Sequence, residues 1–268
     1  MMLRFKIFNP ILKLYSKYTS NRWRGIRFLC YHDVVAVDDL STSRQDKFIV
    51  TVQEFCSHLE YLQKHKYSVV SMQIALELLE SNKAKNGQYI CITFDDGKLN
   101  SFEYAWPVLR EFKYSAHFFI TSTFVCKYMV ESKDERYIDD NQIVQLIREG
   151  ASIGSHSKRH LNLTLLDNNA IFNELVKSQE KLEELCGHPI ETFAYPFGMY
   201  SNRVIKALSK TNYRYAFKLD TGSIISFARE DRYTIPRNVI KNERINHMVN
   251  YLTMSGGYDF TKYFFRLD

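Results

Sequence analysis

The sequence predicts an α/β protein whose parallel strands close into a barrel of the TIM type. Strand-like and helix-like segments alternate from about residue 26 to residue 252. About seven strand–helix units follow one another, with no linker rich in Pro, Gly or Ser and no fixed-period repeat. Histidines and carboxylates come directly after several strands, at the edge where such barrels carry their chemistry.

Composition is that of a globular protein with a sizeable core. The 268 residues are 45% hydrophobic and 25% charged, and the formal net charge is +6. Because the basic residues are not gathered with aromatic residues into one patch, we expect no nucleic-acid partner. The five cysteines include no CxxC pair, which argues against a disulfide framework or a cysteine zinc site and favours a reducing compartment.

Residues 1–22 form a basic amphipathic segment ahead of a domain that spans residues 23–268. Within residues 1–20, lysines and arginines alternate with apolar residues, and Pro10 interrupts the pattern. The segment lacks the apolar core and cleavage site of a signal peptide, and the chain has no apolar run of 18 residues. It either contacts an anionic membrane peripherally or packs on the outside of the domain. We expect a cytoplasmic protein, or one on the inner face of the membrane.

The first half of the domain contains three predicted strands and two predicted helices. The first helix, 52–66, carries Phe55, Leu59 and Leu62 at three- and four-residue spacing, and Ser71 caps the second. The polar stretch 38–47 has no clear period. In chain order the predicted elements are strand 26–31, helix 52–66, strand 67–70, helix 72–79 and strand 89–94.

Strand 89–94 ends in an unusual way. Residues 90–94 are apolar or β-branched, which is typical of a buried strand, and Asp95, Asp96 and Gly97 follow. Taken alone, an Asp-Gly turn explains this ending. However, two adjacent carboxylates near a core are costly unless a cation or a proton neutralises them.

The second half of the domain repeats the strand–helix alternation. Gly150 closes one predicted helix, and the longest predicted helix carries Ile171, Leu175 and Leu182 on one face. The predicted strands are 116–120, 152–155, 192–195, 213–219 and 233–235. The predicted helices are 102–112, 139–149, 166–186, 203–209 and 244–252.

Two histidines complete a candidate metal site. His156 follows strand 152–155, and His160 comes four residues later. Two imidazoles and one carboxylate commonly hold a catalytic divalent metal and leave positions open for water or substrate. Either histidine alone is more simply explained as a residue without a ligand role, but the pair follows an aspartate pair at a strand end.

These residues carry a resemblance to a known family. Thr93-Phe94-Asp95-Asp96-Gly97, followed sixty residues later by His156-Ser157-x-x-His160, resembles the polysaccharide deacetylase family, also called the NodB-homology or carbohydrate esterase 4 domain. The segments 31–34 (Tyr-His-Asp-Val) and 193–198 (Phe-Ala-Tyr-Pro-Phe-Gly) resemble motifs of its exopolysaccharide-deacetylase branch. The resemblance covers about residues 26 to 240.

The resemblance implies a distorted (β/α) barrel that removes an N-acyl, usually N-acetyl, group from a sugar. It implies that Asp96, His156 and His160 hold a divalent metal, commonly zinc, and that Asp95 is the general base. The reaction itself also requires groups of these kinds, whatever the family. Amide hydrolysis needs an activated water, a base for its proton and an acid for the departing amine.

The sequence departs from the family pattern at two places. Ala194 stands where many members carry an arginine that orients the base, and Arg237, after the Ile235-Pro236 turn, either substitutes for it or is a surface arginine. The family's late Leu-x-His motif, which supplies the acid, is not recognisable. We therefore take His32 as the candidate acid, the alternative being a buried histidine at the end of the first strand.

Four residues are candidates for substrate binding: Tyr195, Pro196, Phe197 and Arg237. The two aromatic rings either form a wall on which a sugar stacks or belong to the core.

We expect a metal-dependent N-deacetylase acting on a cell-envelope polysaccharide or its lipid-linked precursor. The lack of a recognisable signal peptide favours a lipid- or nucleotide-linked sugar, or a deformylase-like reaction. The alternatives are a hydrolase of a non-sugar C–N bond on the same fold, and a non-catalytic glycan-binding relative.

Overall fold

The computed structural model describes residues 23–36, 48–125, 137–220, 222–227 and 231–241. Within them, seven parallel strands close into a barrel, because the last strand of the series returns to pair with the first. In order around the ring they are β1 (Gly25–Tyr31), β5 (Gln88–Phe94), β6 (His117–Ile120), β7 (Ser152–Ser155), β8 (Thr192–Ala194), β9 (Tyr215–Leu219) and β10 (Ile235–Val239). The predicted barrel of about seven parallel strands is confirmed.

The ring is distorted at β5. One edge of β5 pairs with β1 from Gln88 to Phe94. The other edge is shared, since β4 (Ser68–Val69) pairs near its start and β6 near its end. The predicted strand 67–70 therefore exists but stands outside the ring. A separate two-stranded parallel sheet, β2 (Asp33–Val35) and β3 (Ile49–Thr51), was not predicted.

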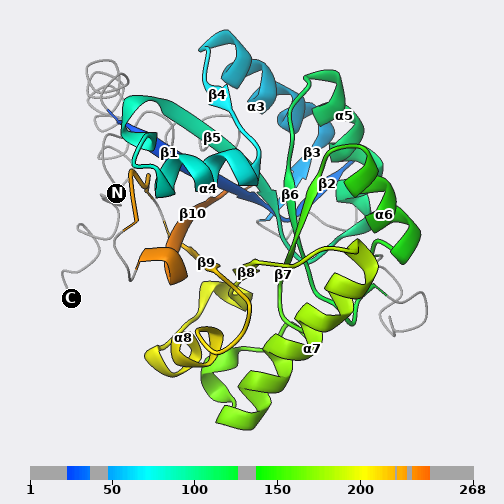
Figure 1. Ribbon diagram of the computed structural model, residues 1–268. Coiled ribbons are helices and arrows are strands. Elements are labelled where there is room, and N and C mark those ends of the chain that lie inside the picture. The colour runs from blue at the N-terminus through cyan, green and yellow to red at the C-terminus, as the bar shows by residue number, and fades with distance from the viewer. Residues whose placement is uncertain (1–22, 37–47, 126–136, 221, 228–230, 242–268) are drawn as a thin grey trace, which may run out of the picture.

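Helices surround the barrel (Figure 1). They are α3 (Val52–Lys64), α4 (Met72–Glu80), α5 (Trp106–Glu111), α6 (Asp140–Arg148), α7 (Asn168–Cys186) and α8 (Asn202–Leu208). Short 3₁₀ turns lie at Ala84–Asn86, Leu163–Leu165, Pro196–Gly198 and Asp231–Tyr233. The predicted helix 102–112 begins instead as a π-helix, Ser101–Ala105, in which Trp106 N–H bonds to the carbonyl of Ser101. Pro107, which has no N–H to continue the usual ladder, lies just after it.

The apolar side chains form two buried clusters. The larger one joins outward-facing strand residues such as Ile90 and Ile92 to helix residues such as Leu59. The other contains Phe28, Phe119 and Phe217 from the opposite strand faces, together with residues of α4. Strand side chains alternate between the two faces, so the continuous apolar run in β5 reflects burial on both sides.

The strand predicted at 233–235 is wrong in its position. β10 begins at Ile235 and continues to Val239, with Pro236 paired to Lys218 of β9. Proline cannot donate to the sheet, so the sequence suggested a turn there. Neighbouring strands on both sides hold this segment extended, and Arg237 is consequently an interior strand residue opposite Phe28 of β1.

Three predicted segments lie outside the described residues: the basic segment 1–22, the polar stretch 38–47 and the helix 244–252. Within the described ranges, none of the helices combines the length and the apolar character needed to cross a bilayer.

Candidate active site

The two aspartates diverge at the carboxyl end of β5. The Asp95 N–H donates to the carbonyl of Tyr31 at 3.0 Å, which continues the pairing of β5 with β1 by one residue. The chain then turns, with φ of +70° at Asp96 and +81° at Gly97. Asp95 is 1% exposed, whereas the Asp96 side chain is 17% exposed. The turn thus separates the two carboxylates into one that is fully buried and one that is partly exposed.

The predicted metal ligands come together. The Nε2 atoms of His156 and His160 lie 3.5 Å and 3.3 Å from the same oxygen, Oδ1 of Asp96. One ligand atom from each of the three residues lies within 4.8 Å of the others. This Oδ1 atom is buried and has no hydrogen-bond partner within the described part of the chain. A buried carboxylate oxygen facing two imidazole nitrogens fits a divalent cation.

His156 is oriented for metal binding. Its Nδ1 lies 2.8 Å from the carbonyl oxygen of Ala194. Because a carbonyl only accepts, Nδ1 carries the proton and the lone pair of Nε2 faces Asp96. Burial lowers the pKa of His156 to about 4, with Asp95 acting in the opposite direction. The ring is therefore neutral near pH 7, as a metal ligand must be.

Arg237 holds Asp95. Its NH1 and NH2 atoms donate to Oδ1 and Oδ2 of Asp95 at 2.5 Å and 2.7 Å, and the guanidinium lies over the ring of Phe119. Burial by itself raises the pKa of Asp95, but the positive charge of Arg237 is the main opposing cause and holds this pKa below its usual range. Arg237 is 0% exposed, so its assignment to substrate binding is wrong. The structure places it where the absent family arginine was expected to act.

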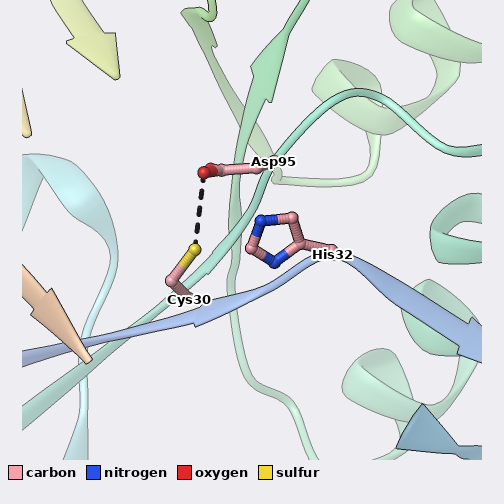
Figure 2. Close-up of side chains that lie close together, drawn as sticks. All are labelled: Cys30, His32 and Asp95. Atoms are coloured by element: carbon pink, nitrogen blue, oxygen red, sulfur yellow. Dashed lines mark hydrogen bonds between the residues drawn. The ribbon is translucent and has the colours of Figure 1, made fainter. Parts of the chain in front are cut away.

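His32 and Cys30 lie on the β1 side of Asp95 (Figure 2). The Cys30 thiol donates to Oδ2 of Asp95 at 3.4 Å. Ring nitrogen, sulfur and carboxylate oxygen all lie within 4.8 Å of one another. His32 stacks on Phe48, and its Nδ1 is buried with no hydrogen-bond partner in the ranges that the structure describes. The structure thus brings His32 to the site, as the sequence led us to expect.

A second cation is not expected among Cys30, His32 and Asp95. The guanidinium of Arg237 already occupies both oxygens of Asp95, and a cation there would meet its positive charge. Burial raises the pKa of Cys30, so the thiol is neutral.

The residues predicted to bind substrate divide into core and rim. Tyr195 is 0% exposed and donates from its hydroxyl to the carbonyl of Tyr233 at 2.9 Å. Pro196 is also buried. Phe197 is 58% exposed, with its ring edge-on to His160 at a centroid distance of 4.6 Å. The sugar-wall prediction is therefore wrong for Tyr195, whereas Phe197 does lie beside the metal ligands.

Sequence reasoning missed two residues near the site. Cys30 was given no role in the site, although it stands two residues before His32 at the end of a predicted strand. Glu174 was not considered. The available signal was an acidic residue between Ile171 and Leu175 on the apolar face of the long helix, where α7 buries it to 1% exposure.

Comparison with known proteins gives matches throughout the domain. The family model described as polysaccharide deacetylase matches residues 82–216. YxkH of Bacillus subtilis, a relative named as a polysaccharide deacetylase, is 24% identical over 73% of this chain, and the match spans 64% of its own length. A poly-beta-1,6-N-acetyl-D-glucosamine N-deacetylase of Staphylococcus aureus is 22% identical over 78% of this chain and 74% of its own.

Solved structures share the fold. IcaB from Ammonifex degensii superposes with a TM-score of 0.73 at 21% identity, covering 86% of this chain and 98% of that one. The Streptococcus pyogenes deacetylase PplD, solved with acetate, gives a TM-score of 0.73 at 19% identity, covering 85% and 98%. The family model matches half of the sequence, and this match includes both the aspartate pair and the histidine pair: the chain belongs to the polysaccharide deacetylase family.

Proposed function

We propose that this protein is a metal-dependent hydrolase that removes an N-acetyl, or another N-acyl, group from an amino sugar of a polysaccharide. The observation that carries the proposal is the trio Asp96, His156 and His160 beside a buried aspartate held by Arg237. Family membership and the names of the relatives support the reaction class.

Asp96, His156 and His160 would hold the metal, and zinc is our first choice because it accepts imidazole and carboxylate ligands readily. When bound, such a metal supplies a water of lowered pKa and polarises the amide carbonyl. The chain contributes the neutral ring of His156 and the Oδ1 atom of Asp96, which no other described group hydrogen-bonds.

Asp95 is the base in this mechanism. Its Oδ2 atom lies 3.8 Å from Nε2 of His156, so the carboxylate borders the metal ligands and can take a proton from the attacking water. Arg237 keeps it ionised and fixes its plane through two hydrogen bonds.

His32 is the acid in this mechanism. It lies beside Asp95 directly after β1 (Figure 2), and its Nδ1 has no hydrogen-bond partner among the described residues. A ring in this position can deliver a proton to the departing amine of the sugar. Base and acid are thus supplied by two different strand ends.

The substrate in this proposal is an N-acetylated glycan of the cell envelope or its lipid-linked precursor. Phe197 offers an exposed aromatic face beside His160, against which a sugar ring can pack. The Staphylococcus aureus relative named for poly-beta-1,6-N-acetyl-D-glucosamine makes that polymer the first substrate to assay.

We also propose that residues 1–20 bring the protein to the inner face of an anionic membrane. The support is their pattern of basic and apolar residues. The test is sedimentation with vesicles of phosphatidylglycerol or of phosphatidylcholine alone. Binding to the anionic vesicles only, lost when residues 1–20 are deleted, is expected. Equal binding by the full and the shortened chain would refute the idea.

The reaction is tested by measuring free amine and acetate released from a panel of N-acetylated oligosaccharides and lipid-linked sugars. Release is expected with added zinc, and it should be abolished by chelator or by Asp95→Asn. Asp140→Asn, on the half-exposed start of α6, is the matched control and should leave the rate unchanged.

Two results would overturn the proposal. Binding of glycans without release of acetate by the wild type would favour the non-catalytic alternative. Release only from non-sugar amides would favour the other C–N hydrolase.

A further inference from the structure

The loop that carries His160 is held in an unusual backbone conformation. Ser157 and His160 have φ of +66° and +56°, a region that residues other than glycine seldom adopt. Such a conformation persists only where surrounding contacts enforce it. The position of the second imidazole therefore depends on what fixes residues 157–160.

One side of the loop is fixed by the segment after β6. The carbonyls of Ser157 and Lys158 accept hydrogen bonds from the N–H groups of Ser122 and Thr123 at 3.1 Å and 3.0 Å. The hydroxyl of Thr123 adds a bond of 2.6 Å to the carbonyl of Lys158. These bonds hold the carbonyl side of the loop but leave the N–H groups of residues 159 and 160 to other partners.

The other side is fixed by Glu174 of α7. Its Oε2 accepts from the Arg159 N–H at 2.8 Å, and its Oε1 accepts from Nε of Arg159 at 2.6 Å. The next N–H, that of His160, donates to the hydroxyl of Ser157 within the loop at 3.0 Å. Glu174 is thus the anchor that α7 provides to the N–H side of the loop.

Burial makes this anchor strong. Glu174 is 1% exposed, whereas the Arg159 side chain is 56% exposed. A carboxylate kept out of water needs hydrogen-bond donors, and the loop supplies two of them through Arg159, so releasing the loop would leave the carboxylate buried without these donors. A 19-residue helix, capped by Asp167 and ended by Gly187, positions the carboxylate rigidly.

We propose that Glu174 is a positioning residue for the metal site: by fixing the backbone N–H of Arg159, the residue next to His160, it sets the affinity for a divalent metal. The inference rests on the proposed function, since it assumes that His160 is a ligand. Partners that orient ligands typically change metal affinity by about 10- to 100-fold when they are replaced. Because Glu174 acts through the backbone, we expect about a tenfold loss.

The experiment measures the dissociation constant for Zn²⁺ by competition with a chromophoric chelator. Glu174→Ala should weaken binding about tenfold or more. Glu174→Gln, which keeps an oxygen for the Arg159 N–H, should weaken it less. Glu180→Gln is the matched control, because this half-exposed residue of the same helix pairs with Lys177 and should not change the affinity. Circular dichroism verifies that each variant is folded.

Cobalt substitution adds a readout that a merely structural role would not move. The visible absorption of Co²⁺ should shift in Glu174→Ala if His160 is displaced, and should match the wild type in Glu180→Gln. Unchanged affinity and an unchanged spectrum in a folded Glu174→Ala would overturn this inference while leaving the metal site intact. If Glu174→Ala does not fold, Glu174→Met takes its place, because it keeps the side-chain volume and removes both acceptor oxygens; unchanged affinity in this folded variant overturns the inference. Absence of metal binding by the wild type would instead overturn the proposed function itself.

Discussion

Replacing Arg237 by methionine tests how the base is held. The substitution keeps much of the side-chain volume but removes the charge and both hydrogen bonds to Asp95. Both side chains are at most 1% exposed, so water cannot take the place of the guanidinium. Asp95 is left as a buried carboxylate without its main partner.

The expected loss of stability follows from the burial of Arg237 and Asp95. Removing one partner of a buried ion pair destabilises a protein by about 3–5 kcal/mol. For a chain of 268 residues, each kcal/mol lowers Tm by roughly 2–4 °C, so a fall of roughly 10 °C is expected. Loss of an oriented, ionised base should also lower kcat near pH 7 by about 10²-fold or more.

The pH dependence of the unfolding free energy shows whether the ionised form of Asp95 is what Arg237 stabilises. In the wild type the pKa of Asp95 is held below that of an unfolded aspartate, about 3.9. The stability this provides is fully present above that pH and is lost as the pH falls below it. In Arg237→Met, burial acts without the opposing charge and raises this pKa, so protonation favours the folded variant. The difference in unfolding free energy between wild type and variant should therefore be largest near pH 7 and shrink toward pH 4.

Urea unfolding with chelator present, from pH 4 to pH 8, measures this difference. The double variant Arg237→Met with Asp95→Asn is the control, because it buries no charge and should recover part of the lost stability. A difference that does not vary with pH, together with no recovery in the double variant, would refute the reasoning.

Three further predictions concern individual side chains. His160→Ala should reduce bound zinc, measured by metal analysis, and full retention of metal would remove His160 as a ligand. Phe197, which is exposed, is proposed to contact the sugar. Phe197→Ala should therefore raise KM for a glycan several-fold with little change in kcat, and a change confined to kcat would contradict this role in substrate binding. His117 is buried with both ring nitrogens on the hydroxyls of Ser152 and Thr192, and burial lowers its pKa to about 3. Since an unfolded histidine titrates near pH 6.5, His117 should reduce stability progressively as the pH falls from about 6.5 to 3, and His117→Gln should flatten that slope in urea titrations.

The barrel and the metal trio were predictable because their signals are local. Continuous apolar runs such as residues 90–94 indicate buried strands, and the residues that follow a parallel strand lie at one edge. His156 and His160 are four residues apart, and only one strand, β6, lies in the sequence between the strand that precedes Asp96 and the strand that precedes His156. Their meeting requires nothing beyond the predicted topology.

The environment of Asp95 was not predictable in the same way. Arg237 is 142 residues away in the sequence and reaches Asp95 because β10 closes the ring against β1. Pro236 suggested a turn at that place, whereas pairing on both sides keeps the chain extended. Cys30, 65 residues from Asp95, arrives through the pairing of β1 with β5.

By itself, the sequence determined the parallel barrel, the edge that carries the chemistry and the trio Asp96, His156 and His160. These follow from apolar periodicity and from polar residues placed at strand ends. Only the tertiary structure decided which side chains stabilise and border them. It buried Tyr195 and exposed Phe197 two residues later, and it turned Arg237 inward onto Asp95. The reason is physical: burial and charge pairing depend on contacts between distant strands, which local sequence patterns do not encode.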